Sequence, residues 1–189
     1  MTTTDKPSTR DRLLDAAADL FYRDGVSIGV EALCRTAGVS KRSMYQLFDS
    51  KEEVLAASLE RRSTRYEALF APGPEEATTP RERILYAFRR LELASVAPDY
   101  QGCPYLAVLV ELKDPAHPAS AVARAMKERA EGAFREQAER GGARDPELLA
   151  RQLMLLFDGA SARSGAGIET LDGLMTATVG TLLDAAGVK

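Results

Sequence analysis

Apolar residues recur with the spacing of an amphipathic helix along most of this chain, and this pattern limits the fold more than any other feature. Between Ser8 and Gly25, for example, Leu13, Ala17 and Leu20 fall on one face of a helix. No run of alternating β-branched residues interrupts the pattern, so a sheet is not expected. The sequence therefore predicts an all-α fold of about nine helices.

Helix breakers and capping residues set the expected boundaries. Four closely spaced helices are expected before residue 71, because Gly25, Gly38 and Ser50 separate the apolar stretches. The polar, proline-rich segment 71–80 then breaks the pattern and is the best candidate for a linker. The helices expected after it span residues 79–97, 105–112, 118–140, 145–162 and 170–186.

Composition excludes several classes of protein. The chain is 45% hydrophobic and 28% charged, which is ordinary for a globular protein with a buried core. No apolar run approaches the roughly 18 residues needed to cross a bilayer, and the polar N-terminus lacks a signal-peptide segment. Cys34 and Cys103 make neither a disulfide framework nor a metal-ligand spacing. We therefore expect a cytoplasmic protein with no metal and no cofactor.

Charge is distributed unevenly along the chain. Residues 1–66 hold 11 Lys and Arg against 10 Asp and Glu, whereas residues 67–189 hold 14 against 18. The net charge of −3 argues against a protein that coats nucleic acid in general. It is compatible with a small DNA-reading element carried on an acidic body.

Residues 37–51 have the spacing of two short helices joined by a tight turn, which is typical of a helix-turn-helix. Gly38 permits the turn, Val39 packs into the core and Ser40 caps the second helix. In this motif the second helix enters the major groove of DNA. The residues that follow Ser40 are therefore candidates for reading bases.

The second helix is expected to have an inner and an outer face. Met44, Leu47 and Phe48 are expected to point inward and anchor it. Arg and Lys suit guanine O6 and N7, while Gln suits adenine N6 and N7 or a phosphate. Lys51 adds a cation at the start of the next helix, where a phosphate oxygen is also favoured. The outward residues are Lys41, Arg42, Ser43, Tyr45 and Gln46.

The Gly-Val-Ser turn followed by Tyr45, Phe48 and Lys51 closely resembles the DNA-binding domain of the TetR family of bacterial transcription regulators. The preceding helix, which includes Arg10, is similar to the first helix of that family. The resemblance in motifs covers residues 8–60, and beyond residue 66 it rests on length and helix count.

The resemblance implies base contacts from Lys41, Arg42 and Ser43 and phosphate contacts from Tyr45 and Lys51. Two positions depart from the family pattern. Leu47 stands where the family usually has Tyr or His, so that backbone contact is expected to be absent. Val30 stands near a common Thr, which leaves phosphate anchoring by the second helix open. The expected DNA-binding set is Arg10, Lys41, Arg42, Ser43, Tyr45, Gln46 and Lys51.

The resemblance also implies how the chain is organised and what it does. We expect a disordered tail (1–7), a helix-turn-helix domain (8–50), a connecting helix (51–70) and an effector-binding and dimerisation domain (71–189). The implied function is a homodimeric repressor that a small-molecule effector releases from a palindromic operator. The alternative is a helical protein-interaction module in which residues 41–51 form a solvated basic face.

Two sets of apolar residues are expected to serve the second domain. The resemblance implies an effector pocket, and few charges interrupt the apolar stripes, which favours an apolar or aromatic ligand. Periodicity places Phe88, Leu91, Tyr105, Leu109, Met126 and Phe134 near it, although such stripes usually serve packing. The last two helices are expected to pair across a two-fold axis, or else to be buried inside one chain. The interface set is Leu149, Leu153, Leu156, Leu171, Met175, Val179 and Leu182.

An enzyme is not expected. A nucleophilic pair of Cys103 and His117 would need an orienting group and an oxyanion site, and the sequence points to neither. His117, the only histidine, lies in an expected loop, where a solvent-exposed residue is the simplest interpretation, although contact with an effector stays open. The sequence does not identify the effector or the operator.

Overall fold

The computed structural model describes residues 7–73 and 75–189, and those ranges hold nine helices and no strand. The expected tail, residues 1–7, lies outside the described residues except for Pro7. No helix in the described ranges is long and apolar enough to cross a membrane. The helices are α1 (Thr9–Asp24), α2 (Val30–Ala37), α3 (Lys41–Tyr45), α4 (Lys51–Phe70), α5 (Pro80–Ser95), α6 (Pro104–Leu112), α7 (Pro118–Arg140), α8 (Pro146–Gly165) and α9 (Leu174–Ala186).

The chain divides into two compact units, which we describe separately. Of the described residues, unit 1 takes in 7–63 and 107–124, and unit 2 takes in the remainder. The boundary falls inside α4, α6 and α7, so each of these helices contributes to both units. Our expected division followed the linker at 71–80, whereas unit 1 also includes a segment from the middle of the chain.

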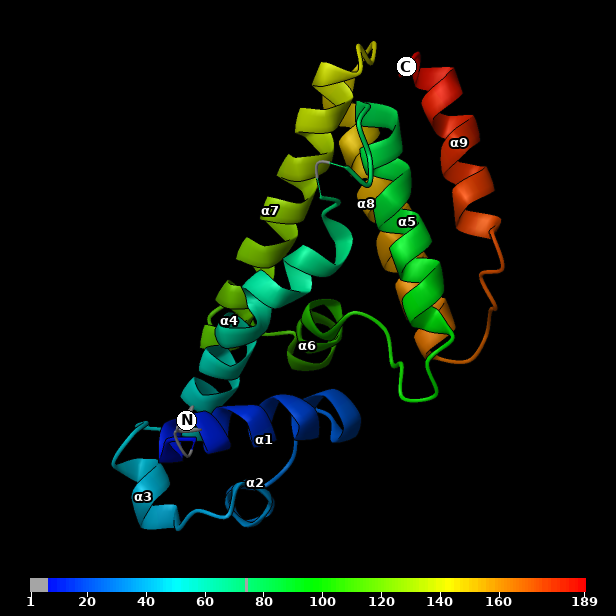
Figure 1. The fold of residues 1–189 in the computed structure, drawn as a ribbon. Coiled ribbons are helices and arrows are strands. Elements are labelled where there is room, and N and C mark those ends of the chain that lie inside the picture. Colours follow the sequence, from blue (N-terminus) through cyan, green and yellow to red (C-terminus); the bar gives the residue numbers. More distant parts are fainter. Residues whose placement is uncertain (1–6, 74) are drawn as a thin grey trace, which may run out of the picture. The chain divides into compact units, whose positions relative to one another are not determined.

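Unit 1 is built on α1, α2 and α3, which contact one another (Figure 1). Its first helix begins with a capping box, in which Ser8 and Asp11 satisfy each other's backbone N–H groups. The expected apolar face of α1 is buried, since Leu13 and Leu14 are almost inaccessible to solvent. Leu33 of α2 and Leu55 of α4 are buried as well. Unit 1 therefore holds its short helices on a real core.

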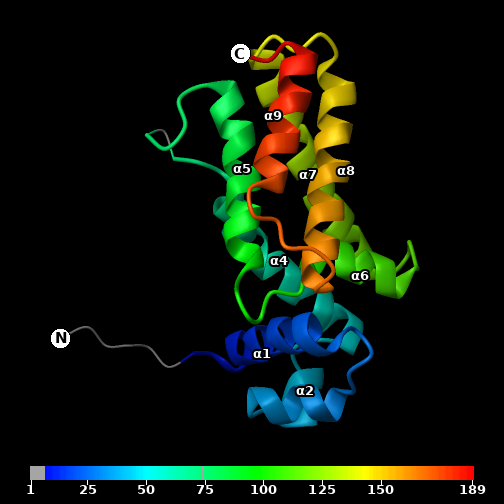
Figure 2. The ribbon, with the colours of Figure 1, turned by 90° about the vertical axis from the view of Figure 1, so that its right-hand side faces the viewer.

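Unit 2 is built on α5, α8 and α9, which lie side by side (Figure 2). Thr79 and Glu82 form a second capping box at the start of α5, with Pro80 in the first turn, as the sequence predicts. Phe88, Leu153 and Val179 are fully buried in its core.

The apolar faces of α8 and α9 are largely buried within this chain. Of the seven expected interface residues, five lie in the core of unit 2, namely Leu149, Leu153, Leu171, Met175 and Val179. Leu156 and Leu182 are partly buried against that same core. A second copy cannot cover the five buried side chains again, whereas Leu156 and Leu182 each keep some exposed surface. Leu148 and Leu155 of α8 and Leu174 of α9 are exposed.

The last helix begins later than its apolar pattern predicts. We expected it from about residue 170, whereas α9 begins at Leu174. Asp172 and Gly173 have positive φ angles of 32° and 80°, a conformation outside the right-handed helix. Leu171 is nevertheless buried, which explains why the periodic pattern extends before the helix.

The two glycines of α8 predict opposite effects on stability. A Cβ on Gly165 would lie 2.4 Å from Gly102 N, whereas a Cβ on Gly159 would meet nothing within 4 Å. Gly165→Ala is therefore expected to lower the free energy of unfolding by about 1–3 kcal/mol. Gly159→Ala should raise it by up to about 1 kcal/mol, because alanine favours a helix. Urea unfolding followed by circular dichroism measures both, and equal effects would contradict the close approach.

Candidate nucleic-acid interface and internal cavity

The turn before α3 has the geometry of a helix-turn-helix. Gly38 adopts a left-handed conformation (φ 63°, ψ 39°), which a side chain would disfavour. The Ser40 hydroxyl accepts a hydrogen bond from the Ser43 N–H at 3.0 Å and so caps α3, as expected. Met44 and Phe48 are buried beneath the helix. The local sequence therefore presents the first turn of α3 on a fixed base.

The outward residues of α3 lie where the sequence places them. Lys41, Arg42, Tyr45 and Gln46 are exposed. Ser43 is only half-buried, and its hydroxyl lies 2.8 Å from that of Ser40. The lysine and arginine on this short helix and the glutamine directly after it provide the donors and acceptors that base edges require.

Leu47 corrects one expectation. We expected it to anchor α3 from within, but 41% of its surface is exposed. The physical reason is that α3 ends at Tyr45, so Leu47 lies in the following turn rather than on the inner face of a longer helix.

Lys41 forms an ion pair that the sequence pattern did not predict. Its Nζ donates a hydrogen bond to Glu31 Oε1 of α2 at 2.6 Å. This hydrogen bond lowers the pKa of Glu31 and raises the pKa of Lys41. Both side chains are exposed, so a phosphate or a base would compete with Glu31 for the ammonium group.

Lys51 lies in a hollow that it shares with Tyr45. Its Nζ donates to the carbonyl oxygens of Val26 and Ile28, at 3.0 and 3.1 Å. No side chain caps the start of α2 at Gly29, so backbone N–H groups at that helix start lack a capping oxygen. The hollow is lined by Ser27, Ile28, Gly29, Val30, Tyr45, Asp49, Ser50, Lys51 and Glu52.

Arg10 lies beside the base of the motif. Its guanidinium carbon is 5.4 Å from the centre of the Phe48 ring, which is the distance of a cation–π contact. The side chain is exposed, and the structure therefore brings a further cation to the side of α3.

Glu111 is a structural residue of unit 1 that sequence reasoning missed. Its Oε1 accepts the Val26 N–H at 2.9 Å, across a separation of 85 residues. The same carboxylate lies where a Cβ on Gly25 would stand, 2.9 Å away, and Gly25 has a φ of 82°. Val26 is thus held by Glu111 through its N–H and by Lys51 through its carbonyl.

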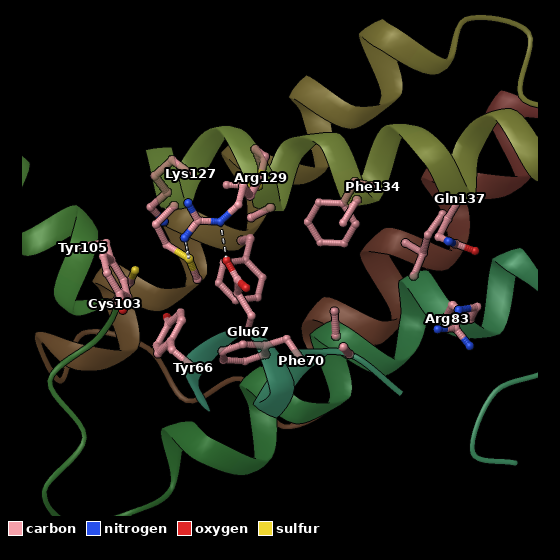
Figure 3. A pocket seen from close by; sticks show the side chains of 18 of the residues that line it. Tyr66, Glu67, Phe70, Arg83, Cys103, Tyr105, Lys127, Arg129, Phe134 and Gln137 are labelled. Carbon is pink, nitrogen blue, oxygen red and sulfur yellow. Dashed lines mark hydrogen bonds and ion pairs between the residues drawn. The ribbon is translucent and has the colours of Figure 1, made fainter. Parts of the chain in front are cut away.

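Unit 2 contains a cavity of about 290 Å³ that is partly open to solvent (Figure 3). Three of the six expected pocket residues, Tyr105, Met126 and Phe134, line it. Phe88 and Leu91 lie in the surrounding core instead, because their helix turns them toward its neighbours. Leu109 lies in unit 1 and is also not part of the lining.

Cys103 lines the cavity, whereas His117 does not. The Cys103 thiol shares a hydrogen bond with the Tyr66 hydroxyl, and burial is the main reason why the pKa of Tyr66 is raised. His117 is half-buried and belongs to unit 1, where its Nδ1 accepts the Ala119 N–H at the start of α7. Within the described ranges, no three His, Cys, Asp or Glu side chains gather where they could hold a metal ion.

Comparisons of sequence match the N-terminal part of the chain. The family described as bacterial regulatory proteins, tetR family, matches residues 13–58. An uncharacterised HTH-type transcriptional regulator of Mycobacterium tuberculosis is 37% identical over 76 residues, which are 40% of this chain and 38% of that protein. The match to this curated relative therefore spans less than half of its length.

Comparisons of structure extend over the whole chain. A crystal structure described as a tetr transcriptional regulator, from Streptomyces avermitilis, is 62% identical with a TM-score of 0.94, covering 96% of this chain and 100% of that one. CifR, a TetR family regulator solved with 26bp operator DNA, is 18% identical with a TM-score of 0.75 and covers 98% of both chains. At that identity, the second likeness concerns the fold alone.

Substitution of Glu111 tests whether it positions the turn that holds Lys51. Glu111→Ala should weaken DNA binding several-fold, because the Val26 N–H loses the acceptor that holds this turn in place. Glu111→Gln is the matched control: it removes the same charge but keeps an oxygen that can accept the hydrogen bond. Fluorescence anisotropy with labelled DNA measures both. If both variants bound more tightly, the carboxylate would act only through its charge.

Proposed function

Because the chain belongs to the TetR family and is a DNA-binding transcriptional regulator, we propose that it is a repressor which a small-molecule effector releases from its operator. Two copies would bind a palindromic operator, each presenting one α3 to a major groove. The members of this family are regulators rather than enzymes. As a repressor, the protein would be located in the cytoplasm, where its operator DNA lies. The alternative of a protein-interaction module without DNA binding is not favoured.

The observation that carries the base-reading part of the proposal is the exposed first turn of α3 above its buried base. Lys41 and Arg42 project from a helix whose inner residue, Met44, is fully buried. Arg42 is assigned to a bidentate contact with guanine. Lys41 would exchange its ion pair with Glu31 for a base or phosphate; Ser43 lies on the same short helix and Gln46 directly after it.

The hollow beside α3 supports a second role, that of gripping a phosphate. Tyr45 and Lys51 line it together with the start of α2, where a helix N-terminus favours an anion. Lys51 has three N–H donors, and the carbonyls of Val26 and Ile28 use two of them. The third remains for a phosphate oxygen. Arg10 adds a cation at the side of the motif.

The homodimer would form through exposed positions of α8 and α9. Leu148 and Leu155 are exposed seven residues apart on one face of α8, and Leu174 is exposed on the neighbouring α9. Ala177 is a small, exposed residue of α9 and would allow a close approach. A two-fold axis makes such a surface complementary to itself.

The effector would act by binding better to a conformation in which the two α3 helices are spaced wrongly for DNA. The cavity in unit 2 is its proposed site, and the aromatic lining suits an apolar or aromatic molecule. α4 is the proposed lever, because one continuous helix carries Lys51 in its first turn and the cavity residue Phe70 at its end. Linkage requires that operator DNA weaken effector binding by the same factor.

A gel shift with the DNA upstream of the chain's own coding region, with unlabelled competitor, tests DNA binding and separates the two assigned roles. Lys51→Ala should weaken binding to all sequences alike. It should also lower the slope of the logarithm of the binding constant against the logarithm of the salt concentration by about one unit per monomer.

Arg42→Ala should instead relax the preference at one base pair in each half-site, a discrimination worth about 1–3 kcal/mol. If Arg42→Ala weakened binding to all sequences alike, Arg42 would contact a phosphate rather than a base. No shift in the wild-type protein would contradict the proposal.

Sedimentation velocity tests the dimer. Leu155→Glu should give monomers that still fold, because 75% of Leu155 is exposed within the chain, and they should lose tight operator binding. Val96→Glu is the matched control, since Val96 is 70% exposed but lies outside α8 and α9. A wild-type monomer at micromolar concentration that still binds its operator tightly would contradict the two-fold arrangement.

A further inference from the structure

We propose that Glu31 reads a base, and that Glu31 and Lys41 together recognise one cytosine–guanine base pair in each half-site. This inference rests on the proposed base contact of Lys41 and gives α2 a share in sequence specificity. Three observations carry it: the carboxylate lies against a base-reading cation, it is open to solvent, and that cation is its main partner.

Glu31 lies on the surface that DNA would cover. It stands in the first turn of α2, and its Oε1 accepts a hydrogen bond from Lys41 Nζ at 2.6 Å. The Glu31 side chain is 77% exposed and the Lys41 side chain 54%. Because α2 and α3 contact each other, a base that reaches the Lys41 ammonium group also comes close to the Glu31 carboxylate.

The carboxylate needs a new donor when Lys41 turns to DNA. The pKa of Glu31 is lowered mainly by the hydrogen bond from Lys41 and by the charge of Lys41, and least by the charge of Arg35, one turn further along α2. Lys41 is therefore the main partner of this carboxylate. A carboxylate that loses its partner beside DNA is repelled by the phosphates and has an acceptor to satisfy.

The major groove offers a donor for Glu31 next to an acceptor for Lys41. Cytosine presents its N4 amino group as a donor, and the guanine with which it pairs presents O6 and N7 as acceptors. Cytosine N4 and guanine O6 are hydrogen-bonded to each other, so they lie a hydrogen-bond distance apart, as Glu31 Oε1 and Lys41 Nζ do. The ion pair can therefore be exchanged for contacts with both halves of one base pair.

The other bases do not suit a carboxylate at this position. Guanine and thymine present acceptor oxygens there, which repel it, and adenine places its N7 acceptor beside its N6 donor. A phosphate contact of Lys41 would leave Glu31 without a donor, so on non-specific DNA Lys41 stays with Glu31. Glu31 thus acts by attraction to cytosine and by repulsion of the alternatives, and both contribute to specificity.

The test is selection from a random library of double-stranded DNA by the full-length protein. Fluorescence anisotropy with the selected duplex and its single-base-pair variants then gives affinities. The wild-type protein should select cytosine at one position in each half-site and bind it about tenfold more tightly than the other three bases. Glu31→Ala should select the same motif without a preference at that position. Glu31→Gln should admit adenine there, because an amide accepts from N6 and donates to N7.

Salt dependence provides a second measurement. Glu31→Ala should bind non-specific DNA more tightly, because Lys41 is then free to neutralise a phosphate. The slope of the logarithm of the binding constant against the logarithm of the salt concentration should become steeper by about one unit per monomer. Thermal unfolding should change little, since an exposed ion pair contributes little to stability.

Glu60→Ala is the matched control. It removes an exposed carboxylate from α4 rather than from α2 or α3, and it should leave the preference for cytosine unchanged. Either of two results would overturn the inference: a cytosine preference that survives Glu31→Ala, or a Glu31→Gln variant that still rejects adenine.

The same selection separates this inference from the proposed function. A wild-type protein that enriches no motif from the library would contradict sequence-specific binding itself. A motif that the wild-type protein and Glu31→Ala select equally would contradict the role of Glu31 alone, and Glu31 would then act on DNA only through its charge.

Discussion

A helix of five residues is not stable by itself in water, because it fixes several residues for very few hydrogen bonds, and α3 has only five. Its geometry therefore comes from Ser40, which caps it, and from Met44, which is completely buried beneath it. The Met44 sulfur lies 3.9 Å from the Cys34 sulfur of α2, so the two short helices are packed directly on each other. The exposed side chains of α3 therefore take their positions from this cap and this buried contact.

The sequence was sufficient for features that depend on neighbours along the chain. Helix periods, the Ser40 cap and the turn at Gly38 are all local, and the structure has each of them. The sequence did not predict contacts between residues that lie far apart along the chain. Nothing in the pattern links Glu111 to Val26, because a carboxylate on a helix is ordinarily solvated. The exposure of Leu47 was missed because the length of α3 decides it.

Periodicity also does not distinguish the three environments in which an apolar side chain of unit 2 can lie. Tyr105 lines a cavity, Phe88 is packed among helices and Leu155 is exposed, yet all three occupy positions that a helical pattern marks as apolar. The pattern predicts that one face of a helix is apolar, but which element covers that face depends on how helices far apart in the sequence pack together. For the same reason, the pattern does not show that five of the seven residues expected at the interface, among them Leu153, are buried within the core of unit 2.

The sharing of α4, α6 and α7 between the two units has a consequence for how such a regulator can be recombined. A fragment that ends at residue 63 would keep every side chain that we propose for reading bases, but it would lose segment 107–124 and with it the carboxylate that holds Val26. The unit that holds the helix-turn-helix is therefore not encoded by one continuous segment of the sequence. A chimaera that exchanges operator specificity must bring both segments from the same parent, or reconcile the turn at Gly25 with whatever residue the new body offers at position 111.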